Sequence, residues 1–183
     1  SPEVNWERSW RRARLRGLSP DLLSFILKLL WLITPTRERL HHILPHLYNS
    51  PNCTLCGDDR TRVPESLAHA LGTCEGNRGL IDRLLDQLRL HHQEVTLQQV
   101  LTLNFHIDPS IELPVIWLII STLNSIWKQR GEGRVKLART RTELEANCRI
   151  LREGRTAEIS NSFAQVSEMV RSMFQPVGIA MMI

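Results

Sequence analysis

The stretch that decides the fold covers residues 108–131 and reads DPSIELPVIWLIISTLNSIWKQRG. Its centre, residues 115–120, is rich in β-branched side chains and admits two interpretations, a buried strand or a buried helix. Apolar side chains in this stretch recur at the 3.6-residue spacing of a helix: Trp117, Ile120, Leu123 and Trp127. The segment is also long for a strand, so we favour a helix and expect an all-α fold.

Helix start and stop signals recur on both sides of this segment. Ser19-Pro20-Asp21 combines an N-cap, a first-turn proline and an acidic residue, and Thr96 with Gln99 matches a capping box. Residues 48–63 are rich in turn formers and are expected to be irregular, and residues 175–183 form a short apolar tail. The other expected helices lie near residues 6–17, 20–33, 34–45, 64–71, 80–88, 134–152 and 157–174.

Length and composition narrow the class of protein. The chain has 183 residues, 42% of them hydrophobic, which is enough for a sizeable core. Residues 1–16 are polar and Arg-rich, unlike a signal peptide, and the apolar run 22–33 is shorter than the ~20 residues that cross a bilayer. We therefore expect an intracellular chain with no membrane partner.

Of 23 basic residues only Lys28, Lys128 and Lys136 are lysines, and arginine grips phosphate with two parallel hydrogen bonds.

A cluster of potential metal ligands lies in and after the irregular loop. Cys53, Cys56, His69 and Cys74 have the spacing C-x2-C-x12-H-x4-C. Three thiolates and one imidazole can surround a zinc ion with no open position, which is typical of a structural site. Free thiols beside a surface histidine, or a catalytic zinc with bound water, are the alternatives. Cys148 lies on an apolar stripe further along and is expected in the core. We expect one structural Zn²⁺, an N-terminal module of helices plus CCHC site over residues 1–78, and a C-terminal helical extension over residues 79–183.

The region around these ligands resembles the zinc-binding segment that follows the reverse transcriptase in LINE-type non-LTR retrotransposon polyproteins. That family has W-x3-W, an apolar helix and P-T-x-x-x-L before a C-x2-C…H…C cluster. The matching segments here are Trp6-x3-Trp10, Phe25 to Trp31, Pro35 to Leu40, Pro51 to Cys56, and Glu65 to Leu71 followed by Cys74. The resemblance is specific over residues 6–78 and softer over residues 103–155.

The resemblance implies a function that the residues alone do not give. It implies that the chain is a C-terminal piece of such a polyprotein, with the reverse transcriptase domain upstream as a partner. Its role would be to hold template RNA or target DNA during target-primed reverse transcription, in the nucleus or between nucleus and cytoplasm. The sequence carries no polymerase or nuclease signature, so we expect this chain itself not to be an enzyme.

Basic residues mark three candidate nucleic-acid contacts. Projection of the first helix places Trp6, Trp10 and Ala13 on a core-facing stripe and its arginines on the opposite, exposed face. A solvated face is the plain alternative for each group. The candidate contacts are Arg8, Arg11, Arg12 and Arg16 on the first helix, Arg60 and Arg62 beside the metal loop, and Lys128, Arg130, Arg134 and Lys136 around Gly131 and Gly133.

The rival function is a protein-interaction module. It would dock on the polymerase or on a host protein, or form a homo-oligomer through the apolar helix 113–127 and the tail 177–183.

Overall fold

The all-α prediction is confirmed. In the computed structural model, residues 3–15, 17–57, 62–91, 94–153 and 157–176 are described, and this part of the chain contains helices and no strand beyond an isolated bridge between Asn52 and Pro64. The α-helices are α1 (Trp6–Ala13), α2 (Pro20–Leu30), α3 (Arg37–Ile43), α4 (Leu80–His91), α5 (Leu97–Leu101), α6 (Glu112–Arg130), α7 (Leu137–Arg152) and α8 (Ala157–Met173). Two short turns, η1 (His69–Thr73) and η2 (Glu75–Asn77), precede α4.

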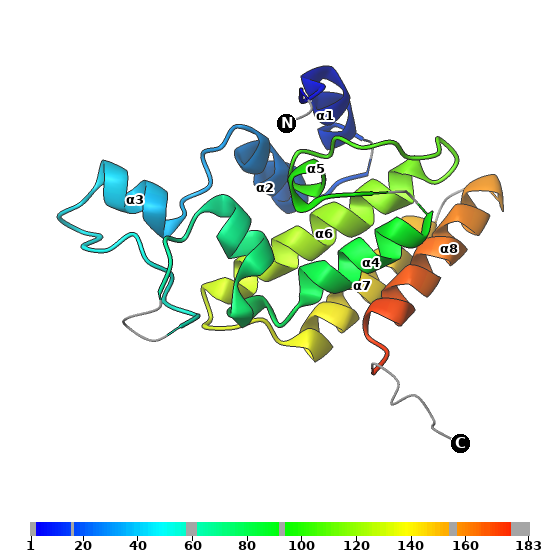
Figure 1. Cartoon of the computed structure of the whole chain (residues 1–183). Helices are drawn as coiled ribbons and strands as arrows, with labels where there is room; N and C mark the ends of the chain where they lie inside the picture. The colour runs from blue at the N-terminus through cyan, green and yellow to red at the C-terminus, as the bar shows by residue number, and fades with distance from the viewer. Residues whose placement is uncertain (1–2, 16, 58–61, 92–93, 154–156, 177–183) are drawn as a thin grey trace.

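Helix α6 forms the axis of the molecule. It crosses the middle of the body in Figure 1, with α1 and α2 on one side and α4, α7 and α8 on the other. Almost every side chain from Pro114 to Ile126 is buried, and Ile116, Ile119 and Ile120 are fully enclosed. Residues 115–120 therefore belong to one 19-residue helix that is buried on both faces, as expected for a helix that is apolar almost all round. The strand interpretation of these residues is excluded.

The burial of α6 also removes one expected interface. Its apolar face packs against α2, α7 and α8 in one hydrophobic cluster that extends from Ala13 to Met173. Residues 113–127 are therefore not free to pair with a second copy, as one version of the interaction hypothesis required. The tail 177–183, the other half of that interface, lies outside the described residues. No described helix is long and apolar enough to span a membrane.

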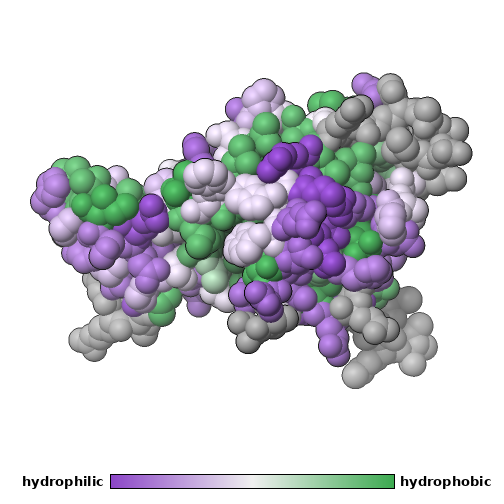
Figure 2. Space-filling model, turned by 90° about the horizontal axis from the view of Figure 1, so that it is seen from above, coloured by the Kyte–Doolittle hydropathy of each residue, from purple (hydrophilic) through white to green (hydrophobic). Residues whose placement is uncertain are grey.

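The local signals place most helix ends. Ser19 caps α2 and Thr36 caps α3, each accepting the backbone N–H of the residue three positions on, and Thr96 with Gln99 forms the capping box that opens α5. Helix α3 and the loop after it stand out from the body at the left of Figure 1, where Ile43 and Leu47 are exposed. Seen from above, this lobe carries hydrophobic surface, whereas hydrophilic side chains gather over α1 (Figure 2).

The expectation for the tryptophan face of α1 is wrong in part. Trp6 is 44% exposed, and Trp10 is half-buried with its ring edge-on to Trp31 at a centroid distance of 6.1 Å. Trp31 is itself 66% exposed. Only Ala13 of the expected stripe is fully buried, and Trp10 packs against the core only in part.

Arg12 is the opposite case, since it was expected on the exposed face and is buried. Its Nε donates to Glu112 at 2.8 Å and its Nη1 donates to the carbonyls of Leu103 and Phe105 at 2.7 Å each. Arg11 donates to the same carboxylate through both Nη atoms, yet its side chain is 55% exposed. The interior position of Arg12 removes it from any nucleic-acid surface and makes it the link between α1 and the start of α6.

We expect Arg12→Met to lower the free energy of unfolding by about 3 kcal/mol or more, because it leaves two buried carbonyls without their donor and weakens a buried ion pair. Arg11→Met is the matched control, since it pairs with the same carboxylate from the surface, and should cost less than about 1 kcal/mol. Urea unfolding of the two variants measures both values, and equal losses would contradict the structure.

The same link predicts a pH dependence of stability. The hydrogen bonds from Arg11, with those from Arg12, lower the pKa of Glu112 from 4.5 to about 2, although burial acts in the opposite sense. A carboxyl whose pKa is lower in the folded state stabilises the fold above its unfolded pKa, and this contribution disappears as the pH falls toward the folded value.

Melting temperatures of the wild-type chain and of Glu112→Gln should therefore differ most at neutral pH. The gap should narrow as the pH falls below about 4.5, the ordinary pKa of Glu112. Loss of metal in acid affects both proteins, so the difference between them is the measured quantity. A gap that stays constant from pH 7 to pH 3 would contradict the assignment.

Candidate metal centre

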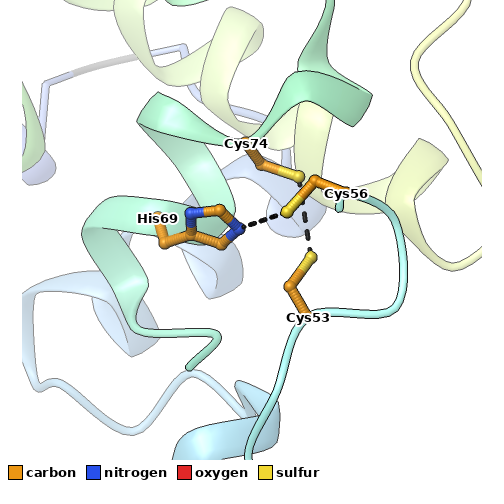
Figure 3. A group of neighbouring side chains, drawn as sticks. All are labelled: Cys53, Cys56, His69 and Cys74. Carbon is orange, nitrogen blue, oxygen red and sulfur yellow. Dashed lines mark hydrogen bonds between the residues drawn. The ribbon is translucent and has the colours of Figure 1, made fainter. Parts of the chain in front are cut away.

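Four side chains converge beside the end of α6. The ligand atoms of Cys53, Cys56, His69 and Cys74 all lie within 4.8 Å of one another (Figure 3). The two sulfurs of Cys53 and Cys74 are 3.6 Å apart, and the Cys56 sulfur is 3.1 Å from Nε2 of His69. Around a tetrahedral zinc ion, bond lengths of about 2.3 Å to sulfur and about 2.0 Å to nitrogen give sulfur pairs about 3.8 Å apart and sulfur–nitrogen pairs about 3.5 Å apart. The side chains present therefore fit one zinc ion.

The loop that carries the first two cysteines is closed by backbone hydrogen bonds. Cys53 donates its N–H to the carbonyl of Val63 at 2.8 Å, and Glu65 donates to Pro51 at 2.9 Å. After Cys56 the chain turns at Gly57, whose φ of +68° is costly for residues with a side chain. The closed loop points both sulfurs inward, toward the turn that carries His69.

His69 begins η1, a single π-helical turn, and Cys74 directly follows it. Cys74 donates its N–H to the carbonyl of His69 at 3.0 Å, so the two ligands lie on the same side of the turn. The sequence predicts an ordinary helix over residues 64–71 that Gly72 ends, and this is wrong, because Gly72 lies inside the turn. Its lack of a side chain serves packing, since a Cβ there would lie 2.4 Å from Cδ2 of Leu97.

The imidazole of His69 is oriented from its far side. Nδ1 lies 3.2 Å from the hydroxyl of Thr73, while Nε2 faces the sulfur of Cys56. In the tautomer with the proton on Nδ1, this N–H donates a hydrogen bond to the hydroxyl oxygen of Thr73, and the lone pair of Nε2 points into the cluster. A hydrogen bond of this kind fixes the tautomer of a metal-bound histidine.

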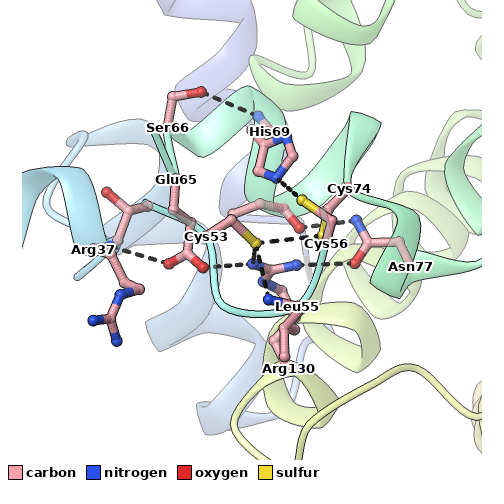
Figure 4. Close-up of polar contacts among 12 residues, drawn as sticks. Arg37, Cys53, Leu55, Cys56, Glu65, Ser66, His69, Cys74, Asn77 and Arg130 are labelled. Carbon is pink, nitrogen blue, oxygen red and sulfur yellow. Dashed lines mark hydrogen bonds and ion pairs between the residues drawn. The ribbon is translucent and has the colours of Figure 1, made fainter. Parts of the chain in front are cut away.

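A buried guanidinium ties the cluster to α6. Arg130, at the last position of the helix, donates to Glu65 at 2.5 Å, to the sulfur of Cys53 at 3.4 Å and to the side-chain oxygen of Asn77 at 3.3 Å (Figure 4). Asn77 in turn donates to the carbonyl of Ala70 in η1 at 2.9 Å, which connects Arg130 to the turn that carries His69. The segments that carry Cys53, Glu65 and Asn77 thus all meet on the side chain of Arg130, which is at least 53 residues away from each of them in sequence.

The electrostatics of the cluster favour one thiolate over another. Burial raises the pKa of Cys53, but the N–H of Leu55 and the guanidinium of Arg130 outweigh it and the net shift is downward. Burial, with Cys53 close by, raises the pKa of Cys56 to about 12. Burial and the charge of Arg130 lower the pKa of His69, which favours the neutral imidazole that a metal requires.

The expected nucleic-acid contacts divide into three groups. Arg130 is buried in the network just described, so its expected surface role is wrong, as for Arg12. Arg16 and Arg60 lie outside the described residues. The remaining candidates keep at least part of their side chain at the surface: Arg8, Arg11, Arg62, Lys128, Arg134 and Lys136. Of these, Arg11 pairs with Glu112, and Lys128 lies 3.7 Å from Asp21.

The sequence gives no sign of the residues that support the metal ligands. Glu65 accepts from Arg130 and from the backbone N–H of Arg37 at 3.0 Å, and it is almost fully buried. Asn77 is fully buried. Neither has a distinctive spacing to the cysteines, and only their burial beside Arg130 reveals them.

The chain matches no protein-family model, no curated protein and no solved structure at a significant level.

We expect the chain, purified without chelator, to carry one zinc ion. Cys56→Ser and His69→Ala should reduce the zinc content and lower the melting temperature, because each removes one of four ligands. Cys148→Ser is the control, since this half-buried cysteine on α7 lies apart from the cluster and should leave the zinc content unchanged. Elemental analysis and thermal unfolding measure both, and a metal-free chain with the same melting temperature would contradict the site.

Proposed function

We propose that the chain is a non-catalytic, zinc-stabilised helical module that binds nucleic acid. The observation that carries the proposal is the set of four ligand atoms in Cys53, Cys56, His69 and Cys74, which is complete for a structural zinc ion. The resemblance of residues 6–78 to the segment after the reverse transcriptase of LINE-type polyproteins adds the biological setting. There the module would hold template RNA or target DNA for the upstream polymerase in the nucleus.

The ligand chemistry argues against catalysis. A catalytic zinc ion keeps one position for water and uses three protein ligands, whereas four protein side chains converge here. The carboxylate of the surrounding network, Glu65, is already bound by Arg130 and by the backbone of Arg37, so it is not poised as a general base.

Basic side chains beside the cluster support binding of phosphate. The loop after α6 is held against η2 by a hydrogen bond from Val135 N–H to the carbonyl of Gly76 at 3.0 Å. We call the exposed side chains of Arg78, Arg134 and Lys136 on these two loops the basic margin. Among the described residues, none of the three lies within ion-pair distance of a carboxylate, so their charge is available to a polyanion.

An exposed apolar patch favours the second candidate function, a protein-interaction module. Trp31, Leu32 and Ile33 are consecutive and are 66%, 61% and 46% exposed. Contiguous apolar surface of this kind is typical of a protein-binding site. The patch lies after α2, beside Trp10, and gives a protein partner or a second copy a surface that the buried helix α6 does not.

Binding to labelled single-stranded RNA, single-stranded DNA and duplex DNA tests the main proposal. Affinity should fall steeply with salt, and the double substitution Arg134→Gln with Lys136→Gln should weaken binding and reduce the salt slope by about 0.7 per lost phosphate contact on a single strand. The matched control is Lys28→Gln with Arg149→Gln, which also removes one lysine and one arginine charge, but from exposed positions on α2 and α7. Absence of binding to every oligonucleotide at low salt would overturn the proposal.

Size-exclusion chromatography of the same protein tests the second candidate. If the apolar patch binds a second copy, Trp31→Ser should shift a dimer to a monomer without changing nucleic-acid affinity. A wild-type chain that elutes as a monomer at all concentrations would exclude self-association through this patch.

A further inference from the structure

A groove of about 440 Å³ lies between the metal loop and the last turn of α6. Thr54 and Leu55 form its edge on the loop side, and Trp127, Lys128 and Gly131 form its edge on the helix side. Arg37 and Glu65 lie in the same wall, next to the network around Arg130. The position of the groove is fixed by the metal cluster, because Leu55 lies between the two cysteines of the loop.

One side of the groove is apolar and can accept a flat ring. Trp127 is half-buried, packed against the core cluster on one side and open to the groove on the other. Leu55, also half-buried, faces the same space. A tryptophan face held in place by a core is the kind of surface on which an unpaired nucleobase stacks.

The polar residues of the groove are mostly cationic. Arg37 uses its backbone N–H on Glu65, while its guanidinium points away from that carboxylate (Figure 4). The Nε of Arg37 is buried without a hydrogen-bond partner among the described residues. A buried donor that finds no acceptor costs free energy. Because solvent does not reach this Nε, the part of Arg37 that a bound anion can contact is the rest of its guanidinium, on a side chain that is only half-buried.

Two further observations fix the net charge of the groove. Lys128 is 51% exposed and lies 3.7 Å from Asp21, which is 81% exposed, so solvent screens that ion pair. Glu65, the carboxylate in the wall, is compensated by the guanidinium of Arg130 at 2.5 Å. The groove therefore offers two cations, Arg37 and Lys128, beside an aromatic face.

From this arrangement we infer that the groove binds one unpaired nucleotide of a single strand, its base stacked on Trp127 and its phosphate held by Arg37 and Lys128. The inference rests on the proposed nucleic-acid function and adds to it the site and the strand state. A paired base cannot turn its face to Trp127, so the groove selects single strands over duplex, whether RNA or DNA.

Fluorescence anisotropy with a short labelled single strand, as RNA and as DNA, and with the matching duplex tests the inference on the full zinc-loaded chain. Trp127→Leu should weaken single-strand binding about tenfold and leave duplex binding unchanged. Trp31→Leu is the control, because it removes an exposed tryptophan that does not line the groove.

Charge reversal provides a second variant that does not depend on the folding of Trp127→Leu. Lys128→Glu should also weaken single-strand binding about tenfold, whereas Arg89→Glu should not. The two positions have similar exposure and a similar ion pair, since Arg89 on α4 is 49% exposed and lies 3.7 Å from Asp86, much as Lys128 lies from Asp21. Arg89 also donates from Nε to the carbonyl of Val95 at 3.2 Å, so its replacement tests the fold at least as severely. Circular dichroism and zinc content confirm that each variant is folded.

The outcomes separate the two proposals. Single-strand binding that weakens about tenfold in both groove variants and is unchanged in both controls supports the inference. Wild-type binding that Lys128→Glu leaves unchanged overturns the groove and keeps the proposed function. A wild-type chain that binds no oligonucleotide overturns the proposed function, and the groove inference with it.

Discussion

The metal centre depends on the hydrogen bonds that the buried guanidinium of Arg130 makes. A buried charge is costly unless it is paired and hydrogen-bonded, and here Glu65 pairs with the guanidinium while Asn77 and the sulfur of Cys53 accept further hydrogen bonds from it. These partners belong to the metal loop, to the segment after it that contains Glu65, and to η2, which have few apolar side chains with which to pack against one another. Arg130 therefore replaces a hydrophobic core as the element that joins the metal loop to the helical body.

The N-terminal end of α6 is also joined to another part of the chain by arginine–carboxylate pairs. Glu112, in its first turn, receives Arg11 and Arg12 from α1, and Arg12 also satisfies two carbonyls of the chain before α6. The helix is thus largely apolar in its middle, carries a buried polar contact to α7 at Ser125 and Gln129, and is ionic at both ends. This division explains how one helix can be the core of the body and still position two separate structures, the α1 arm and the metal centre.

The sequence reveals local structure and the ligand set, but it does not reveal the partners of buried charges. The capping signals at Ser19 and Thr96 and the apolar period of residues 108–131 depend on neighbours in sequence, and the helices they predict form. The spacing of Cys53, Cys56, His69 and Cys74 likewise predicts a cluster that the structure brings together.

The errors share one physical cause. Arg12 and Arg130 look like members of a polar face because their carboxylate partners, Glu112 and Glu65, are 100 and 65 residues away. Trp6 looks like a core residue because helical projection cannot tell how far α1 overlaps its neighbour. Gly72 looks like a helix end, although what distinguishes its position is the side chain of Leu97 packed against it. Each of these depends on tertiary packing rather than on local sequence.

The most direct measurement of the central claim is hydrogen–deuterium exchange of the zinc-loaded chain and of the same chain after removal of zinc by a chelator. If Arg130 joins the metal loop to α6, metal removal should increase exchange at residues 53–56 and 69–77 and also at the amides of the last turn of α6, while α4 and α8 stay protected. Increased exchange in the loop with unchanged protection at residues 127–130 would show that the two are independent and would contradict the account.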